Sequence, residues 1–295
     1  MDYQCDICTS NCQVYLTAVN WRDPESNKGY QILKCDACGH GKTLSASNDT
    51  SLYSSQFYDA KPKIRLNFFK LLIETIADIF VVLDRRWRMT IPKTLGVRPS
   101  CAEIADIGCG DGGLVDYLNE NGWSATGFEY SEYIRKVNPK IRDIATLEQI
   151  FSQFNFIYLN HVMEHTQNPL FTLKKIKNTL KPNGFIYIEV PNFDSAEQEV
   201  FGEFNLHLDV PRHIHHFTES SLTILIQKAG FRVQKRQWLP FIFFGTALRS
   251  LWSMKRTIPT EGKNTSVAIL MFLFRKCFRK KSPVLSFVVT PHQTY

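Results

Sequence analysis

The chain has 295 residues, 44% of them hydrophobic, which is enough to bury the core of one large domain and a small one. Its formal net charge of +7 is modest and does not by itself indicate a nucleic-acid partner. The first residues are polar and acidic, and no run reaches the roughly 18 clean apolar residues of a membrane-spanning helix, so we expect a cytoplasmic protein without a secretory signal.

Two cysteine pairs open the chain, Cys5-x-x-Cys8 and Cys35-x-x-Cys38. Four thiolates suit a tetrahedral Zn²⁺ ion in a closed structural site, and in a reducing cytosol a metal is favoured over disulfides. We therefore predict a zinc-ribbon-like module over residues 1–45 with these four ligands. A site that has lost its metal, or two unrelated pairs, is the alternative interpretation.

Residues 46–95 are expected to form a bridge between two modules. The stretch 43–55 is rich in Ser, Thr and Asn and is typical of a linker. Pro62 is expected to open an amphipathic helix that runs to Leu83. The basic run 84–88 at its end favours a solvated face.

A glycine-rich loop follows the apolar run 102–107, and a helical period begins directly after it. Glycines at 108, 110 and 112 allow a tight turn and a close approach of the backbone to a ligand, so we expect no room for side chains at Gly108 and Gly110. The next strand, 125–129, ends in Glu129, a carboxylate placed to accept two ribose hydroxyls. Together these features indicate a nucleotide site at the carboxyl ends of parallel strands. A purely structural turn would not explain Glu129.

The loop resembles the first motif of class I S-adenosylmethionine (SAM) methyltransferases more than the dinucleotide fingerprint, because an acid opens it and its glycines alternate. The resemblance implies that SAM is the cofactor. It also implies that Asp106 orders the loop near the methionine end and that Glu129 binds the ribose. The cofactor-binding residues expected on this basis are Asp106, Gly108, Cys109, Gly110, Gly112, Glu129, Tyr130, Asp143, Asn160 and His161.

Strands and helices alternate from about residue 100, which predicts an α/β fold with a doubly wound, mainly parallel sheet over a core at 96–240. The expected helices are 113–121, 169–180 and 219–229, the last capped by Thr218. The expected strands are 102–107, 125–129, 155–160, 185–190, 231–238 and 284–290, with a turn at 181–184 and a poorly patterned stretch at 141–144. The family resemblance implies a seven-stranded, Rossmann-like methyltransferase sheet in which 284–290 is the antiparallel strand.

Three downstream segments, 160–165, 188–192 and 207–218, resemble small-molecule methyltransferases. The group includes ubiquinone-biosynthesis O-methyltransferases, and the last segment looks like one in bacterial methyltransferases encoded with surface-polysaccharide enzymes. The cysteine pairs resemble the amino-terminal metal module of some nucleotide-sugar methyltransferases. The resemblance therefore implies methylation of a small-molecule hydroxyl, of a sugar or glycan in particular.

Five of the eight histidines lie in the segments 161–165 and 213–216, each of which follows a strand end. A hydroxyl acceptor is helped by a base, and histidine suits that role near neutral pH. We expect the catalytic residues to be His213, His216 and His165, with Arg212 as an anion contact and His215 at the surface.

Two alternatives stay open for the first histidine segment. In the family that it resembles, Glu164 and His165 often shape the cofactor pocket and order its loop. A divalent metal held by His161, Glu164, His165 and a later histidine is the other alternative, although a carboxylate would be expected at position 161.

The region 241–295 is expected to form a helical cap or insertion followed by the final strand. Its apolar runs and the basic cluster 275–281 also suit peripheral membrane contact through 267–281. A helical hairpin over the substrate site is the plainer interpretation.

A second function remains open, an RNA methyltransferase that holds RNA with its zinc module. A phosphate-tracking surface should be strongly basic. Residues 1–45 instead balance four basic against five acidic side chains: Arg22, Lys28, Lys34 and Lys42 against Asp2, Asp6, Asp23, Glu25 and Asp36. A non-catalytic SAM-binding scaffold is the third alternative.

Overall fold

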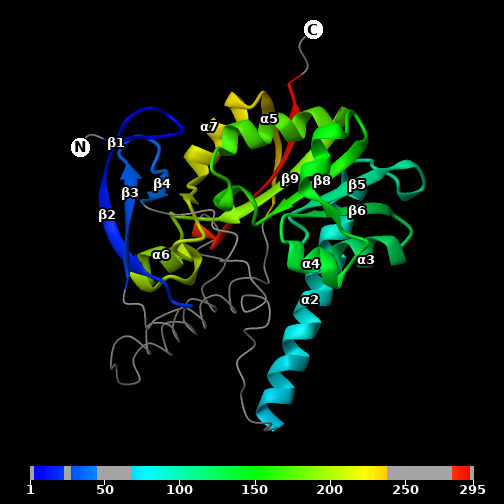
Figure 1. The fold of residues 1–295 in the computed structure, drawn as a ribbon, viewed down its shortest axis with the longest axis horizontal. Coiled ribbons are helices and arrows are strands. Elements are labelled where there is room, and N and C mark those ends of the chain that lie inside the picture. The colour runs from blue at the N-terminus through cyan, green and yellow to red at the C-terminus, as the bar shows by residue number, and fades with distance from the viewer. Residues whose placement is uncertain (1–2, 23–27, 45–67, 238–280, 293–295) are drawn as a thin grey trace. The chain divides into compact units, whose positions relative to one another are not determined.

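The computed structural model describes residues 3–22, 28–44, 68–237 and 281–292, with the backbone alone for 68–80 (Figure 1). The predicted linker lies almost wholly outside these residues, as do the start of the helix at Pro62 and most of the predicted cap and membrane-contact segment. Two compact units divide the chain. One comprises 1–48, 161–175 and 187–295, and the other comprises 49–160 and 176–186.

A seven-stranded sheet confirms the predicted fold class. Its strand order is β11-β12-β9-β8-β5-β6-β7. The pairs β5–β6, β5–β8 and β6–β7 are parallel, and β11–β12 is antiparallel, as expected for the last strand. The strands are β5 (Glu103–Ile107), β6 (Ser124–Glu129), β7 (Arg142–Asp143), β8 (Phe154–Asn160), β9 (Leu180–Pro191), β11 (Phe231–Gln237) and β12 (Val284–Pro291).

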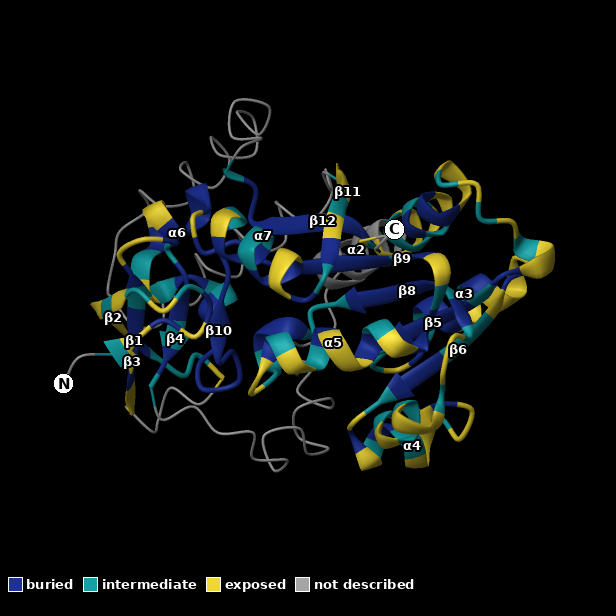
Figure 2. Cartoon of the chain, turned by 90° about the horizontal axis from the view of Figure 1, so that it is seen from above, coloured by how far each residue is buried: buried dark blue, intermediate teal, exposed yellow. Residues whose placement is uncertain are grey.

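The helices are amphipathic, and Figure 2 shows exposed outer faces on α5, which lies along the buried strand β8, and on α4, which lies beside β6. The predicted cap of α7 is confirmed, because Thr218 and Ser221 form a reciprocal capping box. The helices are α2 (Phe68–Thr94), α3 (Gly113–Glu120), α4 (Glu132–Val137), α5 (Pro169–Thr179), α6 (Ala196–Phe201) and α7 (Glu219–Lys228). Short 3-10 turns include η3 (Pro99–Cys101), η4 (Ile144–Gln149), η5 (Met163–His165), η6 (Gly202–Phe204) and η7 (Leu206–Leu208).

One local prediction was wrong, and a second, the solvated face of the run 84–88, was wrong at Arg88 while Arg86 is exposed as expected. The turn expected at 181–184 lies inside β9, where Asn183 adopts a left-handed conformation with φ 65°. The basic run at 84–88 lies inside α2, which continues to Thr94, and its last member Arg88 is only 7% exposed. Arg88 is buried because the hydroxyl of Tyr158 bonds to its carbonyl oxygen and its guanidinium bonds to Asn160.

A second, five-stranded sheet lies in the unit that contains the cysteines. Its order is β1-β2-β3-β4-β10, and its pairs are antiparallel. The strands are β1 (Tyr3–Gln4), β2 (Asn11–Val19), β3 (Gly29–Cys35), β4 (Gly41–Thr43) and β10 (His215–His216). The amino-terminal strands therefore complete their sheet with β10, a strand from the later histidine cluster at 213–216. The domain boundaries expected from the sequence stay predictions.

A small hydrophobic core joins the same two parts of this unit. Ala18, Tyr30 and Ile32 of β2 and β3 pack in one buried cluster with three residues of the later chain: Phe193, Leu208 and Val210. Burial of this apolar surface stabilises the pairing of β4 with β10.

No helix among the described residues has the length and apolar character needed to cross a membrane. Contact with a membrane surface through 267–281 stays a prediction, since all of that segment but Lys281 lies outside the described residues.

Candidate active site

The glycine loop after β5 has the backbone conformation that its sequence indicates. Gly108, Gly110 and Gly112 all lie in the left-handed region, with φ of 75°, 55° and 86°. The amide of Gly108 donates a hydrogen bond to the carbonyl of Phe128 in the neighbouring strand at 2.7 Å. Gly112 is the N-cap of α3. The turn therefore aims the start of α3 at the carboxyl edge of the sheet.

The described protein atoms do not confine Gly110, so the expectation of no room for a side chain there stays a prediction for the ligand-bound loop. A Cβ atom added there would meet no described heavy atom within 4 Å. Glycine is required by the positive φ, and this face of the loop is open. At Gly127, by contrast, a Cβ would lie 2.8 Å from Sγ of Cys109, so the Cys109 side chain fills that side of the loop. Burial raises the pKa of the Cys109 thiol, which keeps it neutral.

Glu129 is held at the end of β6 by three backbone amides. Its Oε2 accepts a hydrogen bond from Gly110 at 2.9 Å, and its Oε1 accepts from Tyr130 and Ser131 at 2.8 and 3.0 Å. A carboxylate offers about four acceptor sites, so these bonds fix its orientation and leave capacity for hydroxyl donors. The Tyr130 side chain is exposed.

Asp106 is a buried carboxyl group at the end of β5. Its Oδ1 has no hydrogen-bond partner among the described residues. Burial raises its pKa to about 7, while the nearby charge of Arg88 acts in the opposite direction. A buried acidic oxygen without a donor suits a ligand that carries positive charge or an N–H group.

Arg88 is a residue of this edge that the sequence interpretation missed. Its Nη1 donates to Oδ1 of Asn160 at 2.5 Å, and its Nε donates to Asp84 at 2.7 Å. Asp143, another expected cofactor ligand, pairs with Arg135 at 2.9 Å and bonds to the amide of Ala145. No feature of the local sequence distinguishes Arg88 from the other basic residues of the run 84–88.

The four predicted cysteines lie together in the other unit. Sγ of Cys5 is 3.6 Å from Sγ of Cys38, and Sγ of Cys8 is 3.4 Å from those of both Cys35 and Cys38. Four sulfurs bonded to zinc at about 2.3 Å stand roughly 3.8 Å apart, so the donor set fits a tetrahedral ion. The amides of Ile7 and Cys38 also point at cysteine sulfurs.

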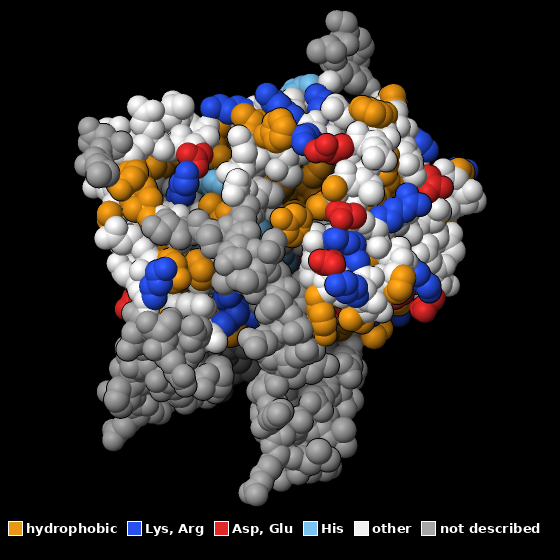
Figure 3. All heavy atoms as spheres, in the orientation of Figure 1, with side chains coloured by type: hydrophobic (Ala, Val, Ile, Leu, Met, Phe, Trp, Pro, Cys, Tyr) orange, Lys and Arg blue, Asp and Glu red, His pale blue; other side chains and the backbone are white. Residues whose placement is uncertain are grey.

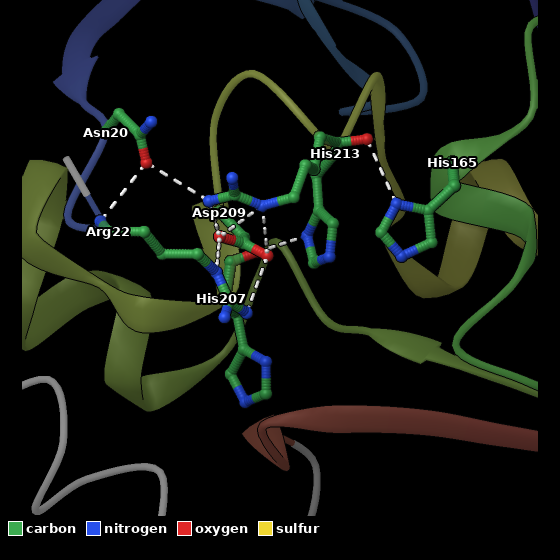
Figure 4. Close-up of polar contacts among 7 residues, drawn as sticks. Asn20, Arg22, His165, His207, Asp209 and His213 are labelled. Atoms are coloured by element: carbon green, nitrogen blue, oxygen red, sulfur yellow. Dashed lines mark hydrogen bonds and ion pairs between the residues drawn. The ribbon is translucent and has the colours of Figure 1, made fainter. Parts of the chain in front are cut away.

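The rings of His165 and His213 pack edge to face with their centroids 4.7 Å apart (Figure 4). Nδ1 of His165 bonds to the carbonyl of Arg212 at 3.0 Å, and Nδ1 of His213 bonds to the carbonyl of His207 at 2.7 Å. Because a carbonyl can only accept, each Nδ1 carries a proton and each Nε2 is the basic nitrogen. Burial lowers the pKa of His213 to about 4, so its ring is neutral at neutral pH.

His216 and His215 lie side by side in β10 and make different contacts. Nε2 of His216 lies 2.8 Å from the hydroxyl of Thr43, and burial holds its pKa well below the usual range. The prediction that His215 is at the surface was wrong, since it is 1% exposed. It is buried because β10 pairs with β4 and its ring stacks on His40, with Nδ1 3.0 Å from Nε2 of His40.

Arg212, expected as an anion contact, is occupied by protein groups. Its guanidinium bonds to Asp209 at 2.6 Å and to Asn20 at 3.1 Å. Arg22 binds both oxygens of the same Asp209, at 3.1 and 3.2 Å (Figure 4). Burial opposes the charge of Asp209, but the bonds from Arg212 hold the pKa of that carboxyl well below its usual range.

His161 lies between two buried carboxylates, although its own side chain is 39% exposed. Its Nδ1 is 3.0 Å from Glu164 and its Nε2 is 3.3 Å from Glu189. Burial opposes protonation, but the hydrogen bonds to both carboxylates raise the pKa of His161 to about 10. For the metal alternative, the structure groups Glu164 with His165 and His213, whose ligand atoms lie within 4.8 Å of one another. His161 is outside this group.

Comparison with known proteins identifies a family for this chain, and a solved structure shares its fold. Residues 82–236 match the family model described as a methyltransferase domain. The chain is 25% identical over 151 residues to a ubiquinone biosynthesis O-methyltransferase of Coxiella burnetii, a match that covers 44% of this chain. It spans 63% of the length of that relative.

Two solved structures were compared with the chain, and the first shows the fold. A 1,6-didemethyltoxoflavin-N1-methyltransferase of Burkholderia thailandensis, crystallised with bound 1,6-didemethyltoxoflavin and S-adenosylhomocysteine, matches with a TM-score of 0.50 at 16% identity. That match covers 90% of this chain and 96% of the other. A SAM-dependent methyltransferase of Archaeoglobus fulgidus matches with a TM-score of 0.48 at 18% identity, over 76% of this chain and 99% of the other.

Proposed function

The chain belongs to the methyltransferase-domain family, whose model spans residues 82–236, and from that membership we propose that it transfers a methyl group from SAM to a hydroxyl of a small molecule. The observation that carries the proposal is the anchored carboxylate of Glu129 beside the open face of the glycine loop at Gly110. This pairing joins an acceptor for ribose hydroxyls to a backbone that a ligand can approach closely.

The residues at the edge of the sheet fit SAM. Glu129 would accept the ribose hydroxyls, and the buried Asp106 would face the cationic methionine end. Arg88 fixes the amide of Asn160 through its short hydrogen bond. When bound, SAM supplies a methyl group already activated by its sulfonium. The remaining task of the protein is to align the acceptor and exclude water.

The histidines are proposed to manage the proton of the acceptor. His165, His213 and His216 each have one ring nitrogen fixed by a neighbour and one basic nitrogen left by that contact. Burial keeps His213 and His216 neutral, and a neutral imidazole can accept the proton that a hydroxyl loses.

The finer substrate proposal is a sugar or glycan hydroxyl. The similarity to an O-methyltransferase supports a hydroxyl acceptor in general, and the sequence resemblance of residues 207–218 is what favours a sugar or glycan. RNA is the weaker alternative. On the face that Figure 3 displays, Lys and Arg side chains are scattered among acidic and apolar ones and do not gather into one basic surface.

We also propose that the four cysteines bind one structural zinc ion. The closed set of four sulfurs leaves no ligand position for substrate, so the ion would stabilise the fold and take no part in chemistry. Its binding would couple to the folding of the five-stranded sheet.

The test is methyl transfer from labelled SAM to nucleotide-sugars, glycan oligomers and total RNA in parallel, together with calorimetry of SAM binding. We expect SAM binding, and label in a sugar fraction. Label in RNA alone would overturn the acceptor proposal. If the folded protein did not bind SAM, the proposal that it transfers a methyl group from SAM would be overturned.

A further inference from the structure

Thr43, the last residue of β4, bonds to two residues of the histidine segment, defined here as residues 207–218. Its hydroxyl donates to the carbonyl of His213 at 2.8 Å and lies 2.8 Å from Nε2 of His216. A threonine hydroxyl has one proton, and the carbonyl takes it. The hydroxyl must therefore accept from Nε2–H of His216, which leaves Nδ1 as the basic nitrogen of that ring. Thr43 is 2% exposed, so water does not compete for these bonds.

The backbone continues the same connection. The amide of Thr43 donates to the carbonyl of Ile214 at 2.9 Å, and Gly41 pairs with His216 in the β4–β10 ladder. A Cβ at Gly41 would lie 2.9 Å from Cβ of His216 and 2.6 Å from the ring of Phe193. The two strands are thus in the close register that only glycine permits at this position.

Two further contacts link the histidine segment to the cysteine module, defined here as residues 3–22 and 28–44. At the start of the segment, Arg22 makes its two bonds to Asp209 (Figure 4). At its end, the hydroxyl of Thr218 donates to the carbonyl of Cys38 at 2.7 Å. Cys38 is one of the four clustered cysteines, so this hydrogen bond joins the histidine segment directly to a proposed zinc ligand.

We propose that the cysteine module is the positioning element of the histidine segment, and that Thr43 sets the tautomer of His216. The catalytic meaning of this arrangement rests on the proposed function, but the arrangement itself does not. Binding of zinc by the four cysteines would hold the turn at Cys35–Cys38 in one conformation. Because β4 follows this turn and bonds to the histidine segment, the positions of His213 and His216 would be fixed as well. Thr43 is a positioning residue that acts through these histidines.

The first test is nitrogen NMR of the histidine rings in the full chain, with the His216 signals assigned by their loss in His216→Gln. We expect wild type to show the tautomer protonated at Nε2. Thr43→Val should give a mixture of tautomers, because the hydroxyl acceptor is gone. Thr43→Ser keeps the hydroxyl and should restore the wild-type signals. Thr17→Val, at an exposed threonine of β2, is the matched control.

The second test is amide hydrogen exchange, which also covers the case in which Thr43→Val fails to fold. Zinc-loaded wild type is compared with Cys35→Ser and with Arg22→Met, which removes one contact at the partly exposed edge. We expect exchange in residues 209–218 to rise at least tenfold in Cys35→Ser and to rise near Asp209 in Arg22→Met. A rise in exchange that is confined to residues 1–45 in Cys35→Ser would overturn the proposal. An unchanged His216 tautomer in Thr43→Val would overturn it as well.

Both tests are read without SAM or acceptor, so failure to find methyl transfer leaves them valid. Where an acceptor is identified, Thr43→Val should lower kcat at least tenfold with an unchanged Kd for SAM, and Thr43→Ser should recover it. Equal loss of SAM affinity would contradict the positioning role.

Discussion

The guanidinium of Arg88 donates a hydrogen bond of 2.5 Å to the side-chain oxygen of Asn160, 72 positions later in the chain. This bond connects the last turns of α2 to the residue that ends β8. Arg88 also influences the buried Asp106 by its charge. A helix that the sequence indicated only as a bridge therefore supplies a buried cation to the edge of the sheet where the cofactor is expected.

We predict that Arg88→Met weakens SAM binding by about 1–3 kcal/mol, because Asn160 and Asp106 lose a buried charged partner. Calorimetry of SAM binding measures the effect. Arg86→Met, two positions earlier and exposed, should bind SAM like wild type. Equal affinity in both variants would show that Arg88 serves stability alone.

Glu129→Ala should weaken SAM by about 1–3 kcal/mol, since two ribose hydroxyls lose their acceptor and the loop amide of Gly110 loses its partner. Glu132→Ala, on the exposed side of α4, is the control and should leave affinity unchanged. Unchanged affinity in Glu129→Ala would refute the ribose assignment.

Asp106 should make the stability of the ligand-free protein depend on pH. Its pKa of about 7 in the fold exceeds the ordinary 3.8, so the folded state binds the extra proton between these values. That stability is present below pH 3.8 and is lost as pH rises to about 7, at up to about 1.4 kcal/mol per pH unit. Urea unfolding from pH 5 to 8 should show the loss in wild type and in exposed Asp116→Asn. Asp106→Asn should lack it, and parallel curves for all three would contradict the assignment.

Elemental analysis should find one zinc per chain, and Cys35→Ser should lose it. Cys12→Ser should keep it, because Cys12 lies outside the cluster of four. Cys35→Ser should still bind SAM, since Asp106 and Glu129 lie in the other compact unit. Carefully purified wild-type protein without zinc would end this claim.

Replacement of His213 or His216 by Ala should lower kcat by roughly 10²–10⁴-fold if that residue is the base, with SAM binding nearly intact. His292→Ala, at an exposed histidine, is the control. Full turnover in both Ala variants would assign these residues a structural role and leave His165 as the remaining candidate. Loss of SAM binding would place them in the wall of the cofactor pocket.

The sequence alone determined features whose partners are close along the chain. The left-handed glycines at 108, 110 and 112, the capping box at Thr218 and the two cysteine knuckles each depend on residues within a few positions. Their local chemistry therefore specifies their geometry. The order of strands and helices followed in the same way from periodicity and turn residues.

Only the tertiary structure decided which distant residues meet. Thr43 bonds to His213 across 170 positions and Arg22 bonds to Asp209 across 187, and neither pair has a spacing that a sequence pattern can reveal. Burial of Arg88 and of His215 likewise depends on the elements packed against them. Exposure and pairing are properties of the assembled sheet, because each is set by surfaces that come together only on folding.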